Sequence, residues 1–168
     1  DNDAVYLSTS DGRGLDWSAA VRMDSPGARR KTSWALAVCE RNVVVAWVEE
    51  DGLTFDQTLC VNTFDVETRT LLGEQKLSFP TAADRVYRID LKASRVEEGD
   101  LVYLLARTRE PDVGSWPGGD LFLFVSGDCG GDFGLPAHVV DPEADVGWFD
   151  SAVDGSAVWV AWVNEGGD

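Results

Sequence analysis

Short apolar runs alternate along the chain with segments rich in glycine, aspartate and proline. Valine, tryptophan, phenylalanine and threonine dominate the runs and favour strands, whereas the segments between them carry residues typical of turns. Signals for amphipathic helices are weak by comparison. The pattern therefore predicts an all-β chain built from short strands and tight turns.

One apolar motif repeats, and its spacing indicates a repeated unit. The Val-x-Val-Ala-Trp-Val core of Asn42–Glu50 recurs 115 residues later in Ala157–Glu165, and Asp100–Arg107 between them has the same shape. A period of roughly 50 to 60 residues, made of strands and turns, is typical of the four-stranded blade of a β-propeller. In order within the unit, the expected strands are Trp34–Cys39, Tyr87–Ala93 and Trp148–Val153 (first), Val43–Glu49, Leu101–Arg107 and Val158–Asn164 (second), Val5–Ser8, Thr58–Asn62 and Leu121–Val125 (third), and Ala19–Met23, Thr70–Leu77 and Ala137–Val140 (fourth).

A turn motif follows the expected strand Leu121–Val125. Residues Ser126–Phe133 read Ser-x-Asp-x-Gly-x-x-Phe. The aspartate at the third position is suited to accept hydrogen bonds from N–H groups of its own turn, and the glycine supplies a positive φ. The motif resembles the Asp-box of the bacterial neuraminidase repeat, and Thr9–Trp17 and Thr63–Thr68 resemble poorer copies. The resemblance assigns structural roles in these boxes to Asp11, Trp17, Asp65, Ser126, Asp128, Gly130 and Phe133.

The resemblance implies a single propeller domain over residues 1–168, with blades of four antiparallel strands. The expected divisions are an outer half-blade at 1–24, blades at 32–79 and 86–141, and an inner half-blade at 146–168. Three blades' worth of chain cannot close a ring, because known propellers have at least four blades. Either two copies complete a six-bladed ring as a homodimer, or the chain is part of a larger propeller.

The charge balance excludes some partners. The chain carries 30 acidic and 14 basic residues, a net charge of −16. Such a surface repels nucleic acids and anionic membranes, and no apolar run is long enough for membrane insertion. The acidity is typical either of a salt-adapted organism or of an ordinary acidic protein. We expect an extracellular or surface-associated protein, with a cytoplasmic protein of a salt-adapted organism as the alternative. The chain begins at Asp1 without a methionine, so the removal of a targeting segment before this residue is kept as an alternative.

Arginines gather on the face that the resemblance assigns to ligand binding, which is opposite the boxes. The candidate ligand-binding residues are Arg30, Arg85, Arg88, Arg107, Arg109 and Trp116. Guanidinium groups bind carboxylate, sulfate or phosphate in a fork, and a loop tryptophan suits stacking on a sugar. The hypothesis is a site for an anionic or neutral glycan, or for a protein partner. The alternative is that these arginines form ordinary surface ion pairs.

Tyr87-Arg88-Ile89 resembles the sialidase motif whose arginine holds the substrate carboxylate, but Asp90 stands where that motif has proline. The further catalytic residues of a sialidase are not evident, and retaining hydrolysis needs a positioned pair of groups. The expected function is therefore non-catalytic recognition or assembly. The alternatives are a sialidase-type glycoside hydrolase, or a fragment of one, and a structural surface or particle subunit. No cofactor or metal is expected, because the acidic runs lack a calcium-loop pattern.

Three cysteines give an odd count without a zinc signature. Cys39 and Cys60 are expected on the first and third strands of one blade, about 10 Å apart, which is too far for a disulfide. The sequence therefore predicts free thiols at Cys39 and Cys60.

Overall fold

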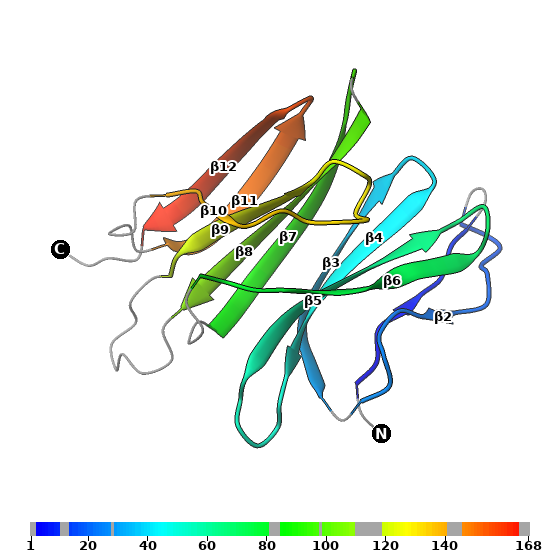
Figure 1. Cartoon of the computed structure of the whole chain (residues 1–168), viewed down its shortest axis with the longest axis horizontal. Helices are drawn as coiled ribbons and strands as arrows, with labels where there is room; N and C mark the ends of the chain where they lie inside the picture. Colours follow the sequence, from blue (N-terminus) through cyan, green and yellow to red (C-terminus); the bar gives the residue numbers. More distant parts are fainter. Residues whose placement is uncertain are drawn as a thin grey trace.

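The computed structural model describes residues 3–10, 14–27, 29–80, 85–97, 99–109, 119–140 and 146–164. The regular secondary structure in these ranges consists of β-strands, and they form four antiparallel sheets, none of which closes into a barrel (Figure 1). The all-β antiparallel class expected from the sequence is confirmed. Among the described residues, no helix has the length and apolar character needed to cross a membrane.

Two four-stranded sheets form the centre of the molecule, and in each the strands follow one another in chain order. Sheet II consists of β3 (Arg30–Cys39), β4 (Asn42–Glu50), β5 (Gln57–Asp65) and β6 (Thr70–Leu77). Sheet III consists of β7 (Arg85–Val96), β8 (Gly99–Arg109), β9 (Leu121–Ser126) and β10 (Ala137–His138).

Each end of the chain contributes a two-stranded sheet. Sheet I pairs β1 (Tyr6–Leu7) with β2 (Val21–Arg22), and sheet IV pairs β11 (Val146–Asp154) with β12 (Ala157–Asn164). The observed strands contain or overlap the ones expected from the sequence. Strands β3, β5, β7 and β8 extend beyond the expected bounds, whereas β1, β2 and β10 are shorter than expected.

The first strands of sheets II, III and IV lie side by side. Figure 1 shows β3, β7 and β11 running in the same direction, and β7 packs between β3 on one side and β11 on the other. We call the edge of the molecule where these three strands begin the entry edge. The opposite edge, which carries the hairpins between β3 and β4, β7 and β8, and β11 and β12, is the hairpin edge.

The sheets pack face to face through apolar side chains. Val44 and Ala46 of β4 meet Leu104 and Ala106 of β8 in a core between sheets II and III, and all four are completely buried. The other face of β4, including Trp47, packs against sheet I. Both faces of β4 are therefore covered, which explains its continuous apolar sequence.

A second interface joins sheets III and IV. Leu105 of β8 and Leu121 of β9 pack with Val146 and Phe149 of β11. The four sheets thus form a stack in chain order, with an apolar layer between each neighbouring pair.

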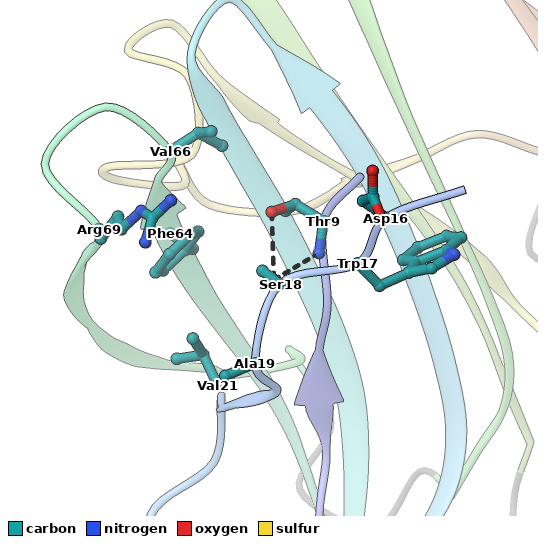
Figure 2. Close-up of a pocket in the computed structure, with 9 residues that line it drawn as sticks. All are labelled: Thr9, Asp16, Trp17, Ser18, Ala19, Val21, Phe64, Val66 and Arg69. Carbon is teal, nitrogen blue, oxygen red and sulfur yellow. Dashed lines mark hydrogen bonds between the residues drawn. The ribbon is translucent and has the colours of Figure 1, made fainter. Parts of the chain in front are cut away.

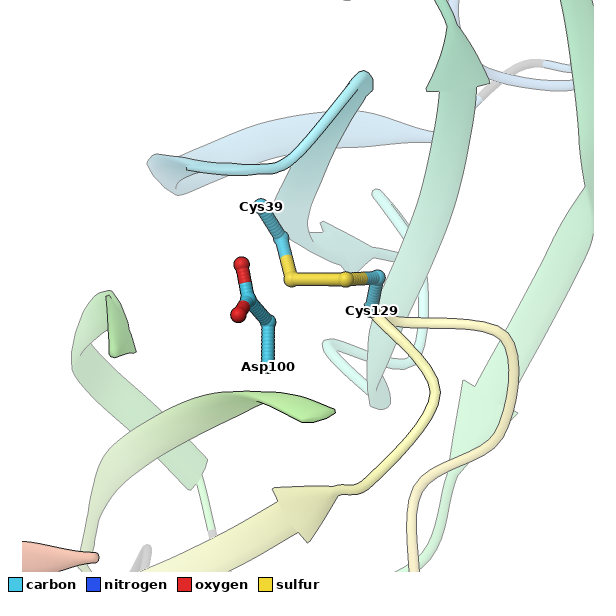
Figure 3. Close-up of side chains that lie close together, drawn as sticks. All are labelled: Cys39, Asp100 and Cys129. Atoms are coloured by element: carbon cyan, nitrogen blue, oxygen red, sulfur yellow. A yellow bond between two sulfur atoms is a disulfide. The ribbon is translucent and has the colours of Figure 1, made fainter. Parts of the chain in front are cut away.

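Cys39 and Cys129 form a disulfide, so the prediction of a free thiol is wrong for Cys39 (Figure 3). Cys39 ends β3, whereas Cys129 lies in the turn after β9, and their Cα atoms are 5.4 Å apart. The bond therefore joins sheet II to sheet III at the hairpin edge. Cys60 is a buried free thiol, and its burial, together with the nearby charge of Glu49, raises its pKa to about 12.

Candidate functional site

Four of the predicted ligand-binding arginines lie together at the entry edge. Arg85 at the start of β7 is paired with Arg109 at the end of β8, and Arg88 is paired with Arg107. This pairing concentrates positive charge at one edge of a chain whose net charge is −16. Like charges directly opposite each other on neighbouring strands destabilise a sheet.

Aromatic rings hold three of these guanidinium groups. The guanidinium carbon of Arg88 lies 5.2 Å from the ring centres of both Trp148 and Phe149. Arg85 lies over Phe55 at 5.6 Å, and Arg109 lies over Tyr87 at 5.8 Å. These distances suit cation–π attraction, which orients a cation without neutralising it.

Arg107 is held in a different way. Its Nε donates a hydrogen bond of 2.5 Å to the main-chain oxygen of Val146 at the start of β11. Arg107 therefore fastens sheet IV to the end of β8 beside the arginine cluster.

Arg88 lines a shallow hollow of about 380 Å³ between sheets III and IV. Trp148, Asp150 and Trp162 contribute to its walls. Aromatic faces, one cation and one carboxylate are the groups that a sugar-binding site uses for stacking and for hydrogen bonding. Among the described residues, no carboxylate lies within ion-pair distance of Arg88 or Arg85.

The two other candidate residues are placed differently. Arg30, at the start of β3, belongs to the entry edge, but its guanidinium is largely exposed and lies 3.8 Å from the carboxylate of Glu50. This contact matches the ordinary surface ion pair considered as the alternative. Trp116 lies outside the described residues.

The turn around Asp128 has the local hydrogen bonds typical of a capped turn. Asp128 Oδ1 accepts a 2.6 Å bond from the Ser126 hydroxyl and a 2.9 Å bond from the N–H of Asp132, and Gly130 N–H donates to Ser126 Oγ at 2.9 Å. Burial acts to raise the pKa of Asp128, but the hydrogen bonds outweigh it, so the pKa lies below the ordinary value. Phe133 is buried in the core between sheets II and III.

Gly130 also brings this turn into close contact with sheet II. Its φ is +86°, and a Cβ added there would lie 2.6 Å from Val44 Cγ2 and 2.9 Å from Thr63 Oγ1. Its carbonyl oxygen accepts hydrogen bonds from Thr63 Oγ1 at 2.8 Å and from Gln75 Nε2 at 3.1 Å. The turn therefore fastens sheet III to sheet II, next to the disulfide.

Of the two poorer boxes, the one at Asp65 keeps hydrogen bonds from its own turn, whereas the one at Trp17 does not keep its aromatic residue buried. The N–H groups of Glu67 and Thr68 donate to Asp65 Oδ1 at 2.9 and 3.0 Å, and these bonds together with the charge of Arg41 lower the pKa of Asp65. Trp17 is 65% exposed rather than packed between strands, and its indole N–H donates to Gly14 O. Asp11 lies outside the described residues.

A second hollow, of about 500 Å³, lies near Trp17 between the loop after β1 and the hairpin that joins β5 to β6. Thr9 and Ser18 line it on the loop side, and Phe64 and Arg69 line it on the hairpin side (Figure 2). The hydroxyl of Ser18 accepts a 3.0 Å bond from the Thr9 N–H, so this hydroxyl is already engaged by the loop. The figure shows the indole of Trp17 pointing away from Phe64 and Arg69.

Sequence reasoning missed a buried ionic cluster beneath sheet I. Lys31 Nζ lies 2.5 Å from Glu49 Oε1 and 3.4 Å from Asp24 Oδ2, and all three side chains are almost completely buried. Asp24 also binds Arg22 and the N–H of Val5, and these partners outweigh its burial and lower its pKa. No sequence signal marks Lys31, because Asp24 lies near it only after sheet I has packed on sheet II.

The disulfide has an acidic neighbour. A carboxylate oxygen of Asp100 and the sulfurs of Cys39 and Cys129 lie within 4.8 Å of one another (Figure 3). The closed disulfide removes the thiolates that a soft metal ion would need, and Asp100 is also bonded to Arg95. The structure therefore presents this group as a covalent link between sheets.

No protein-family model, curated protein or solved structure matches the chain. The fold and the geometry of the site therefore carry the functional argument. They define an all-β protein with a cationic, aromatic-lined entry edge and a covalently fastened hairpin edge.

Proposed function

We propose that the chain is a β-propeller segment that acts as a non-catalytic recognition and assembly module, and that its entry edge binds an anionic glycan. The order of the strands within sheets II and III supports the propeller arrangement, as does the placement of β3, β7 and β11 side by side. Blades of four antiparallel strands around a shared axis have this organisation.

The arginine cluster carries the binding proposal. Arg85 and Arg88 have no carboxylate within ion-pair distance among the described residues, so an anion bound beside them would stabilise the edge. Arg88 faces two aromatic rings, and its hollow offers Trp148 and Trp162 for stacking on a sugar. A carboxylated or sulfated oligosaccharide provides both the charge and the flat apolar face that this edge would recognise.

The same hollow favours binding over hydrolysis. Asp150 is the one carboxylate among the described residues that line it. Retaining glycosidases need two carboxyl groups, or a comparable nucleophile and acid, on either side of the scissile bond. Turnover of a fluorogenic sialoside by the purified chain would overturn the non-catalytic assignment and favour the hydrolase alternative.

Titration calorimetry with matched oligosaccharides tests the site. We expect carboxylated or sulfated chains to bind better than their neutral counterparts, and Arg88→Ala to weaken binding by at least tenfold, or about 1.4 kcal/mol. Arg95→Ala is the matched control, because Arg95 lies on the same strand near the hairpin edge and pairs with Asp100. Equal affinity of the Arg88 and Arg95 variants for every ligand would refute the proposal.

A further inference from the structure

The outer sheets I and IV each end in a strand that pairs on one side. Among the described strands, β1 pairs with β2 alone and β12 pairs with β11 alone. We propose that a second copy of the chain completes both sheets, with β12 of each copy pairing antiparallel with β1 of the other. This inference deepens the assembly role proposed above and rests on its propeller arrangement.

Sheet IV matches the first two strands of sheet II, β3 and β4, which we call its inner half. The Val-x-Val-Ala-Trp-Val core lies on β4 and on β12. The hairpins also correspond, because Cys39 pairs with Asn42 and Asp154 pairs with Ala157 around two-residue turns. Sheet IV is therefore equivalent to strands β3 and β4 without the strands that follow them in sheet II.

Sheet I matches the last two strands of sheet II, β5 and β6, which we call its outer half. When Thr9 is placed on Thr63, as their box motifs indicate, Val5 and Leu7 fall on Leu59 and Val61. Leu59 and Val61 pack toward the next sheet in the stack, and so do Val5 and Leu7. Sheet I is therefore equivalent to β5 and β6, and it lacks the half that sheet IV provides.

The exposed apolar side chains lie where this completion would cover them. On β3, Trp34, Leu36 and Val38 face the same side as sheet I, yet Trp34 is 71% exposed because sheet I has no inner strands to cover it. On β12, Trp159 is 54% exposed, although its counterpart on β4, Val44, is completely buried.

A second copy covers both patches with the same contact. Sheet IV of one copy would extend sheet I of the other and place Trp159 against the β3 face that carries Trp34. The twofold axis repeats the contact, so one self-complementary interface closes the assembly and removes both open edges. Exposed aromatic residues of this size are typical of the buried centre of an interface.

The internal equivalence also fixes the register of the new strand pair. In sheet II, Val45 of β4 pairs with Asn62 of β5. Val160 occupies the position of Val45 in β12, and Ser8 occupies the position of Asn62 beside β1. Val160 of one copy should therefore lie directly opposite Ser8 of the other, with Cα atoms about 4.5–5.5 Å apart.

The charge of the chain adds a condition. Two copies with a net charge of −16 each repel one another, and the repulsion is screened over about 3 Å at ~1 M salt. Apolar burial is not weakened by such screening. We therefore expect the dimer to be favoured as the salt concentration rises.

Disulfide trapping tests the register. The variants Ser8→Cys and Val160→Cys are each made in a Cys60→Ala background, one of them with a size tag, and are then mixed at high salt under mild oxidation. We expect a covalent species that contains one copy of each variant, because opposed positions in a strand pair satisfy the Cα separation of a disulfide. Ala161→Cys in place of Val160→Cys is the control, since a shift of one residue turns the thiol to the other face and the interface keeps Trp159.

Light scattering on the unmodified chain gives the second measurement. A mass twice that of one chain at high salt, together with trapping of the Val160 variant over the Ala161 variant, supports the proposal. A monomer at every salt concentration, or equal trapping of both variants, overturns it. Loss of glycan binding in a chain that still forms the trapped dimer would instead refute the recognition role while leaving the assembly intact.

Discussion

The Cys39–Cys129 disulfide allows a quantitative prediction, because it closes a loop of known length. The two residues are 90 positions apart in the sequence. Constraint of the unfolded chain over such a loop stabilises the folded state by roughly 4.6 kcal/mol at 25 °C in the chain-entropy relation. That is a large part of the roughly 5–15 kcal/mol that holds a typical domain folded. We therefore expect reduction of the bond to lower the free energy of unfolding by about 3–5 kcal/mol.

Urea or guanidinium unfolding of the oxidised and reduced chain measures this difference. The double variant Cys39→Ala/Cys129→Ala should unfold close to the reduced protein and should not respond to the reductant. Cys60→Ala is the matched control. It removes the buried free thiol and keeps the disulfide, so reductant should destabilise it as much as it destabilises the original chain.

Thiol counting provides the refuting result. Alkylation of the denatured, unreduced chain should label Cys60 and leave the other two cysteines unlabelled. Three labelled thiols, or oxidised and reduced proteins that unfold at the same denaturant concentration, would show that the covalent link between sheets II and III is absent or without effect on stability.

Three further predictions concern stability. Lys31→Met should cost about 3–5 kcal/mol in denaturant unfolding, because it removes the ion-pair partner of the buried Glu49 carboxylate, whereas Asp24 keeps its pair with Arg22. Adding Glu49→Leu should recover part of the loss. A change below about 1 kcal/mol for Lys31→Met alone, on the order of a surface ion pair, would contradict this reasoning. Gly130→Ala should lower the melting temperature more than Gly155→Ala, since both glycines have positive φ but only at Gly130 would an added Cβ clash with the neighbouring sheet. Equal losses would disprove the close approach. Acid should destabilise the chain, because folding lowers the pKa values of Asp24 and Asp128. Their contribution to the free energy of unfolding is complete above the unfolded pKa of about 3.9 and is lost as the pH falls below it. Calorimetry that found rising stability from pH 7 to pH 3 would contradict this prediction.

The order of the strands could be predicted because each strand carries its own signal. Strand β4 is apolar throughout because both of its faces are covered, and the repeated motif then locates β12. Two of the outermost strands were predicted less well. The expected strand Ala19–Met23 is reduced to Val21–Arg22, and Ala137–Val140 is reduced to Ala137–His138. The outermost strand β6 has the expected bounds Thr70–Leu77, and it pairs with its neighbour at six positions, whereas β2 and β10 pair at two positions each, so fewer contacts determine their ends.

The arginine cluster could be predicted for a similar local reason. The start of the first strand in a hairpin lies opposite the end of the second, so Arg85 and Arg109 must meet once the hairpin is recognised. The Cys39–Cys129 bond depends instead on how one sheet packs against the next. A pattern of strands contains no information about that packing, and the prediction of free thiols compared cysteines within one sheet only.

The two edges of the molecule differ in how firmly the sheets are joined, and this difference bears on function. At the hairpin edge, the disulfide and the bonds from Thr63 and Gln75 to Gly130 hold sheets II and III together. At the entry edge, Arg85 and Arg88 are held by aromatic rings and lie at the surface of the stack. Under the proposed function, recognition is carried by the arginines of the entry edge, whereas the contacts that hold sheet III to sheet II through Gly130 and the disulfide lie at the opposite ends of the strands. A substitution such as Arg88→Ala should therefore affect ligand binding with little loss of folding stability, and this separation makes the binding test interpretable.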